Sequence, residues 1–292
     1  MTATGPDGLT VVDKPTGMTS HDVVARMRRL AGTRKVGHAG TLDPMATGVL
    51  VLGLGRATRL LGYISGQDKA YTATIRLGVR TVTDDAEGDI VATASTRHLE
   101  QNAISAGLTS LTGTIEQVPS SVSAIKVDGR RAYARIRAGE KVELAARSVT
   151  VSALELNSIQ YPTPDLIDLD IAVVCSTGTY IRALARDLGT HLGVGGHLTA
   201  LRRTRVGDLS IVEARTLEDL VNAPVTHDLA TAVRRSLPTV TVDAGTARAL
   251  GHGQRVKASG LAGVYGVFDP TGAAVALVED VDGRARPVVG FT

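Results

Sequence analysis

The chain has 292 residues and a formal net charge of +3; 43% of its residues are hydrophobic and 21% are charged. This composition is typical of a soluble globular protein with room for one large domain or two ordinary ones. No apolar run approaches the length of a membrane span, and the N-terminus MTATGPDG lacks the regions of a secretory signal peptide. The single cysteine, Cys175, excludes an internal disulfide and favours a reducing cytoplasm.

The type and distribution of the basic residues indicate a nucleic-acid partner more strongly than the net charge does. Of the 32 basic residues, 26 are Arg, whose fork of donors suits phosphate. They gather at Lys14–Lys35, Lys126–Arg147 and Arg182–Arg205. If these clusters converge in the fold, they form a nucleic-acid surface; if they do not, they are solvated helix faces. Six Tyr, two Phe and no Trp exclude a stacking platform for several consecutive bases, although one tyrosine could hold one base.

The N-terminal elements frame a loop that carries a single carboxylate. A short strand is predicted over Leu9–Val12, and Ser20 is a good N-cap for the helix that follows. The stretch VGHAGTLDPMATGVLVL, Val36–Leu52, then passes from a Gly-rich polar loop into an apolar strand. Asp43 precedes Pro44, which restricts its backbone to extended conformations. This pattern fits a reactive group held on a rigid strand, but on these residues alone it fits better a capped turn in which Asp43 bonds its own backbone.

The middle of the chain predicts strands and helices in alternation. Tyr71–Leu77 alternates with a period of two, which predicts a strand in which Tyr71 faces a core. The acidic segment Thr81–Gly88 is expected to be a solvated loop, since its spacing does not match a calcium loop. The other elements are expected as a helix at His98–Leu111, a strand at Val122–Val127, a basic helical excursion at Arg130–Glu140, and strands at Val149–Ile159 and Leu166–Cys175.

A helix is predicted after Thr177-Gly178-Thr179, followed by a basic strand. The apolar face of that helix has the helical spacing of three and four residues. Arg182 lies near its start, where the helix dipole disfavours a cation, so a carboxylate partner would help to hold it. In HLTALRRTRVG, His197–Gly207, Leu201 stands among arginines, which suits an apolar base beside a phosphate chain, or a strand with one buried face.

The C-terminal part predicts a separate module. Short helices are expected at Thr216–Val221 and Asp228–Arg235, and after Pro238 short strands separated by glycines predict a small all-β module. The histidines show no zinc-type spacing and no second cysteine assists, so a metal site is not expected. Gly53-Leu54-Gly55 lacks the third glycine of a dinucleotide fingerprint, which makes a dehydrogenase a distant alternative.

Six ordered blocks resemble the TruB family of tRNA pseudouridine synthases. They are DKPTGMTSHDVV (Asp13–Val24), VGHAGTLDPMATGVLVL (Val36–Leu52), KAYTATIRLG (Lys69–Gly78), SAIKVDGRRAY (Ser123–Tyr133), CSTGTYIRALARDLG (Cys175–Gly189) and HLTALRRTRVG (His197–Gly207). The C-terminal module resembles, more weakly, a PUA-type RNA-binding domain. The resemblance implies an α+β pseudouridine synthase fold, a mixed and mainly antiparallel sheet flanked by helices, with a small β-rich PUA-like domain. It implies a catalytic domain at 1–236, with an RNA-clamping insertion at about 120–147, and a PUA-like domain at 237–292.

The family resemblance also implies a reaction and its residues. These enzymes convert a uridine in the T-arm loop of tRNA, at position 55, to pseudouridine without cofactor or metal, after the base has been flipped out. Asp43 matches the catalytic aspartate, Tyr71 the tyrosine that packs on the base, and Arg182 the arginine that pairs with the aspartate. The resemblance further matches residues to substrate binding: His38, Leu201, Lys14, Lys126 and Arg202, with Lys14 mainly structural.

Two departures from the family pattern leave these residues intact. Ala39 stands where the loop often has threonine, and the block Val118–Lys126 lacks one proline and the tyrosine, which puts any role of that tyrosine in doubt. The expected protein is a cytoplasmic monomer that binds the tRNA T-arm and needs neither a membrane nor a protein partner. The main alternative is a non-catalytic RNA-binding or RNA-folding protein on the same scaffold. A second is a related synthase that works on guided RNA within a complex.

Overall fold

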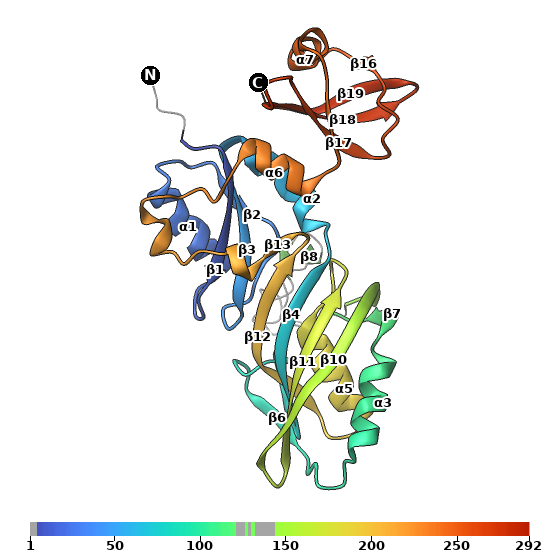
Figure 1. The fold of residues 1–292 in the computed structure, drawn as a ribbon. Coiled ribbons are helices and arrows are strands. Elements are labelled where there is room, and N and C mark those ends of the chain that lie inside the picture. Colours follow the sequence, from blue (N-terminus) through green and yellow to red (C-terminus); the bar gives the residue numbers. More distant parts are fainter. Residues whose placement is uncertain (1–4, 121–125, 128–129, 132–143, 292) are drawn as a thin grey trace. The chain divides into compact units, whose positions relative to one another are not determined.

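The computed structural model describes residues 5–120, 126–127, 130–131 and 144–291 (Figure 1). Its contacts divide the chain into two compact units, residues 1–67 with 205–292, and residues 68–204. The first unit therefore combines both ends of the chain, while the second is one continuous segment. The domains predicted from the sequence, 1–236 and 237–292, differ from this division and stay a prediction.

The N-terminal part of the first unit is a small antiparallel sheet covered by helices. Strand β1 pairs with β3 along its whole length and with the short β14, and β2 pairs with the end of β3. The elements are β1 (Gly8–Lys14), α1 (Ser20–Leu30), β2 (Val36–His38), β3 (Thr47–Leu54), η1 (Gly55–Leu60), α2 (Leu61–Ser65), β13 (Leu209–Ser210), η2 (Ile211–Glu213), η3 (Asp219–Val221), β14 (His227–Asp228) and α6 (Leu229–Ser236).

Helix α1 begins one residue earlier than its sequence suggests. Thr19, not the predicted Ser20, is the N-cap, because its hydroxyl accepts from the Asp22 backbone N–H while the Asp22 carboxylate accepts from the Thr19 N–H. This reciprocal pair is a capping box. Ser20 is thereby free to turn inward, and it is buried.

The C-terminal part of the first unit is a five-stranded sheet in the order β15, β17, β18, β19, β16. Its elements are β15 (Thr239–Thr241), α7 (Ala244–Gly251), β16 (Val256–Lys257), β17 (Val264–Phe268), β18 (Ala274–Val281) and β19 (Arg284–Gly290). β15 and β17 run parallel, and the other pairs are antiparallel. The module was predicted as all-β; α7, which Asp243 caps through the backbone N–H groups of Gly245 and Thr246, is a helix that the prediction missed.

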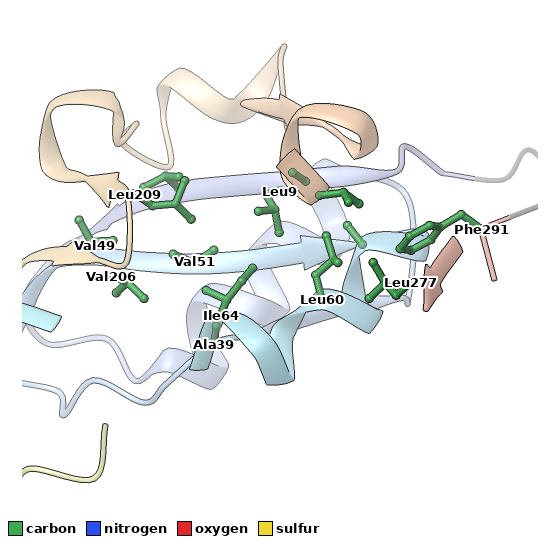
Figure 2. Packing of buried hydrophobic residues seen from close by; sticks show 14 of the residues in the cluster. Leu9, Ala39, Val49, Val51, Leu60, Ile64, Val206, Leu209, Leu277 and Phe291 are labelled. Carbon is green, nitrogen blue, oxygen red and sulfur yellow. The ribbon is translucent and has the colours of Figure 1, made fainter. Parts of the chain in front are cut away.

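One hydrophobic core joins the two parts of the first unit (Figure 2). Phe268, Leu277 and Phe291 of the C-terminal sheet pack in the same cluster as Leu60 and Val233. Polar contacts reinforce this core. Arg56 and Arg59 of η1 donate to the backbone carbonyls of the last strand region, and the Arg234 guanidinium lies 4.0 Å from the centre of the Phe268 ring.

The second unit is built on a larger antiparallel sheet. Its central strands β4 and β11 pair over nine residues, from Ile167 opposite Leu77 to Cys175 opposite Lys69. β12 lies next to β4, and β10 and β7 continue the sheet beyond β11. The elements are β4 (Lys69–Leu77), β5 (Val79–Thr81), β6 (Ile90–Thr93), α3 (Gln101–Ser110), β7 (Gly113–Gln117), β8 (Lys126–Val127), β9 (Arg130–Arg131), β10 (Arg147–Thr163), β11 (Leu166–Cys175), α5 (Ile181–His191) and β12 (Gly196–Val206).

The α+β class with mainly antiparallel sheets is confirmed, and two local predictions for the second unit are wrong. Arg130–Arg131 form a strand that pairs with β8 instead of starting a helix; the rest of the predicted excursion, 132–140, and residues 122–125 of the predicted strand lie outside the described residues. The acidic loop is not fully solvated, because Asp84 and Asp85 are buried. Within the described part of the chain, no helix has the length and apolar character needed to cross a membrane.

Candidate active site

Asp43 lies in the loop that connects β2 to β3, and the backbone of this loop is fixed at several points. Leu42 and Ala46, on either side of Asp43, are buried, while Asp43 itself is half-buried. The Gly17 N–H donates to the Pro44 carbonyl over 2.8 Å, which ties the loop to the turn after β1. Gly40 and Gly48 have φ angles of 88° and 95°, a conformation that favours glycine. The carboxylate is therefore carried by a loop that is anchored on both sides.

Lys14 is the main anchor of this loop. It ends β1, its side chain is fully buried, and its Nζ donates to the carbonyls of Pro15, Pro44 and Ala46 at 2.9, 3.2 and 2.7 Å. An ammonium group has three protons to donate, so these carbonyls match its hydrogen-bonding capacity. The contacts support the structural role that the family resemblance implies for Lys14.

Ser20 provides a second anchor from α1. Its hydroxyl donates to the Leu42 carbonyl at 3.1 Å and accepts from the Leu42 N–H at 2.8 Å. Because Thr19 is the N-cap, the Ser20 side chain at the start of α1 can hold Leu42, the residue that precedes Asp43. Sequence reasoning missed this role, because Ser20 was accounted for as a cap.

Lys14→Met is expected to loosen the Asp43 loop. Methionine fills similar volume but leaves the buried Ala46 carbonyl without its Lys14 donor and the Pro44 carbonyl with only the Gly17 N–H, at a cost of about 1–3 kcal/mol. The melting temperature should fall, and kcat for the chain's reaction should fall with KM for RNA little changed. Thermal denaturation and steady-state kinetics measure both, with Lys35→Met as a control because Lys35 is exposed. Unchanged kcat in Lys14→Met would contradict the anchoring role.

His38 ends β2 at the start of the same loop. Its ring packs edge-on against that of His21 in α1, with ring centres 5.5 Å apart. In the first unit, His38 therefore stands at the start of the loop that carries Asp43, and Lys14, from an earlier segment of the chain, holds that loop. The contribution of His38 to substrate binding stays a prediction.

In the second unit, Tyr71 and Leu201 lie on neighbouring strands. Tyr71 is on β4 and Leu201 on β12, and each side chain is 8% exposed. Tyr71 faces Val173 of β11 in the register, within a row of buried residues at alternate positions of both strands. The period-two prediction for β4 is confirmed, and the two residues matched to base packing share one sheet.

Two cations belong to the same sheet and were missed. Lys69 is two residues before Tyr71 and is 6% exposed, and Arg203 is two residues after Leu201 and is 1% exposed. Burial lowers the pKa of Lys69 to about 8, and the charge of Arg203 acts in the same direction. Cys175, opposite Lys69, has a thiol pKa raised by burial to about 11. Cys175 is thus a buried thiol that resists ionisation, which does not favour a role as a nucleophile.

Arg182 is buried at the first turn of α5. Its guanidinium donates to the Thr83 carbonyl at 2.8 Å and lies 3.5 Å from the Asp85 carboxylate, and both side chains are 5% exposed. Gln117 of β7 accepts from the N–H of the N-cap residue Tyr180 at 2.8 Å, which fixes the start of the helix. The sequence predicted a carboxylate partner for Arg182, and within this unit Asp85 is one. The predicted pairing of Arg182 with Asp43 stays a prediction.

A second pair lies one turn further along α5. Arg186 approaches the Asp84 carboxylate at 3.3 Å and donates to the Val118 carbonyl at 2.7 Å. Asp84 has a φ of 61°, unusual for a residue other than glycine. Burial raises the pKa of its carboxyl, against the lowering effect of Ser120 and Arg186. The acidic loop is therefore a structural partner of α5. The sequence pattern that could have indicated this contact is the four-residue spacing of Arg182 and Arg186 on α5.

The remaining predicted binding residues are Arg202 and Lys126. Arg202 is half-buried on β12, adjacent to the buried Arg203. Lys126 is on β8, where it faces Arg131 in the register of the β8–β9 pair; its side chain lies outside the described part of the structure. Both roles in RNA binding stay predictions.

Comparison with known families identifies the chain. Residues 28–181 match the TruB family pseudouridylate synthase N-terminal domain, residues 182–240 the tRNA pseudouridylate synthase B C-terminal domain, and residues 237–292 the tRNA pseudouridine synthase II C-terminal domain. The chain belongs to the TruB family of pseudouridine synthases. It is thus an isomerase that acts on tRNA, as its relatives' names indicate.

Individual relatives agree along almost the whole chain. The tRNA pseudouridine synthase B of Thermobifida fusca is 55% identical, covering 98% of each chain. That of Nocardia farcinica is 57% identical, covering 96% of this chain and 92% of the relative. A solved structure of an H/ACA RNP bound to a substrate RNA containing 2'-deoxyuridine has a chain with 25% identity and a TM-score of 0.73, covering 98% of this chain and 85% of that one. The predicted pseudouridine synthase fold is confirmed.

Proposed function

We propose that this enzyme converts the uridine at position 55, in the T-arm loop of tRNA, to pseudouridine. The observation that carries the proposal is the anchored Asp43 loop, in which Lys14 and Ser20 hold the residues on both sides of the carboxylate. A carboxylate that is positioned before the substrate arrives avoids the entropic cost of ordering it during the reaction. The target base is stacked in its loop, so it must be flipped out to reach such a group.

The reaction breaks the N-glycosidic bond, turns the uracil and joins its C5 to the same sugar carbon, so substrate and product are isomers. The proton at C5 is lost in the last step, and N1, whose bond to the sugar has been broken, takes up a proton, so the composition of the nucleoside is unchanged. In this proposal Asp43 is the essential carboxylate, as nucleophile towards the ring or the sugar, or as a base. Tyr71 and Leu201 form the apolar slot for the base, and Arg182 keeps the carboxylate ionised. No cofactor or metal takes part.

The working form that we propose is a monomer in the cytoplasm that binds the T-arm without a protein partner. The relatives at 52–57% identity are named as tRNA pseudouridine synthases, whereas the H/ACA assembly matches at 25%. This difference favours a stand-alone enzyme over one that works in a guided complex.

Tritium release from 5-tritiated uridine in a bare T-arm stem-loop, with the purified chain alone, tests this proposal. We expect one tritium released per target uridine. A stem-loop that binds without tritium release would support the non-catalytic RNA-binding alternative. Release only after addition of a guide RNA or a second protein would support the guided complex.

A further inference from the structure

Helix α5, which carries Arg182, begins without a cap of its own. Its N-cap residue, Tyr180, makes no side-chain capping hydrogen bond, and tyrosine is not among the residues that cap helices well. Thr179 is of a type that does, but its hydroxyl donates to the Ser176 carbonyl at 3.0 Å. The first backbone N–H groups of a helix have no partner within the helix, so an acceptor for them has to come from elsewhere.

Gln117, the last residue of β7, supplies such an acceptor. Its side-chain carbonyl accepts from the Tyr180 N–H at 2.8 Å, and its amide nitrogen donates to the Tyr180 carbonyl at 3.1 Å. Only one orientation of the amide group gives both bonds. Gln117 is 1% exposed, and it stands opposite Arg147 of β10 in the register. The cap of α5 is therefore provided by a buried side chain of the sheet.

The capped turn is the one that carries the buried cation. Arg182 is the second residue of α5, where a positive charge opposes the helix dipole. The acidic loop holds the tip of its side chain, through the Thr83 carbonyl and the Asp85 carboxylate. Gln117 holds the backbone from which that side chain starts. The place of the guanidinium therefore depends on both contacts, and unwinding of the first turn would shift it.

The other contact between the end of β7 and α5 differs in kind. Arg186 donates to the Val118 carbonyl at 2.7 Å. This bond joins a long, flexible side chain of the helix to the segment after β7, so its loss leaves the backbone of the first turn in place. Gln117 instead bonds the helix backbone itself. Of these two contacts, the one made by Gln117 is therefore expected to control Arg182.

We propose that Gln117 is a positioning residue for the reaction, which caps α5 through Tyr180 and so sets the place from which Arg182 acts. The inference rests on the proposed function, in which Arg182 keeps the Asp43 carboxylate ionised. A group that acts through its charge is effective when it is held in place before the reaction starts, because no reorganisation is then needed during the reaction. Gln117 provides this hold without contacting the charge.

Gln117→Met tests the proposal, because methionine keeps the length of the side chain and removes both hydrogen bonds. In tritium release from the T-arm stem-loop, well below the melting temperature, we expect kcat to fall roughly 10- to 100-fold with KM within about twofold of the wild type. Gln101→Met is the matched control, since Gln101 is exposed at the start of α3 in the same unit. A lower melting temperature with unchanged kcat would make Gln117 merely structural and overturn the proposal.

A double-mutant cycle with Arg182→Met shows whether Gln117 acts through Arg182. Once Arg182 is replaced, no charge is left to position, so adding Gln117→Met should lower kcat by less than about twofold more. A full additional loss would mean that Gln117 acts by another route, and it would overturn the proposal. A rise in KM with unchanged kcat in the single variant would overturn it as well, because Gln117 would then serve RNA binding.

Hydrogen exchange tests the cap without any substrate. In Gln117→Met the Tyr180 N–H has lost its acceptor, so the amides at the start of α5 should exchange roughly tenfold faster or more, while those of α3 keep their rates. Mass spectrometry of the intact, folded variants measures this difference. Unchanged exchange would overturn the proposal even if the double variant did not fold. Because the measurement needs no RNA, it also holds if the wild type releases no tritium, a result that would contradict the proposed function instead.

Discussion

Replacing Asp43 with Asn is expected to abolish pseudouridine formation while RNA affinity stays close to that of the wild type. The amide keeps the shape of the carboxylate but cannot act as a nucleophile or as a base. Loss of an essential catalytic group lowers kcat by roughly 10⁴-fold or more. Single-turnover tritium release and filter binding measure the two quantities. Because the loop is held by Lys14 and Ser20 through backbone groups, the substitution should leave the fold intact.

Asp22→Asn is the matched control for Asp43→Asn. Asp22 is an exposed carboxylate in the same unit, and its role is the capping box at the start of α1. Its replacement should cost about 1 kcal/mol of stability and leave kcat unchanged. If Asp43→Asn turned over at the control's rate, Asp43 would not be the essential carboxylate.

Removing the buried charge of Arg182 is expected to lower both stability and activity. Arg182→Met leaves Asp85 buried without its partner, and breaking such a pair costs about 3–5 kcal/mol. Asp85→Asn should cost a similar amount, and the double variant less than the sum, because the two residues share one interaction. Urea denaturation measures these energies. Activity at temperatures well below each melting temperature separates folding from catalysis.

The Arg186–Asp84 pair tests whether the activity loss expected for Arg182→Met is specific to Arg182. Arg186→Met breaks the contact with Asp84 in the same helix and the same acidic loop. We expect a loss of stability with kcat close to that of the wild type, whereas Arg182→Met should lose kcat by roughly 10²-fold or more at equal folded fraction. Equal losses of kcat in both variants would mean that Arg182 acts only through the fold.

The sequence predicted the structure best where a residue pattern had only one physical interpretation. The alternation in β4 predicted the strand and the buried side of Tyr71, and the helical spacing after Thr179 predicted α5. The same alternation also places Lys69 on the side of Tyr71 and Arg203 on the side of Leu201. Both were overlooked because charged residues are usually exposed.

The errors come from contacts that local patterns do not encode. The acidic loop has the composition of a solvated turn, and only the fold brings Asp84 and Asp85 against the arginines of α5. Ser20 and Thr19 are both good caps, and the reach of Ser20 to Leu42, far along the chain, decides between them. Helix α7 is short, contains two glycines and is held by the sheet beneath it, so its own sequence signal is weak.

The most direct test of the central claim is to map pseudouridine in a full-length tRNA transcript before and after incubation with the purified chain alone. Chemical modification and primer extension locate the product to single-nucleotide resolution. The proposed function predicts one new pseudouridine, at position 55 in the T-loop, and none with the Asp43→Asn variant. Pseudouridine at another position, or its formation by the Asp43→Asn variant, would contradict it.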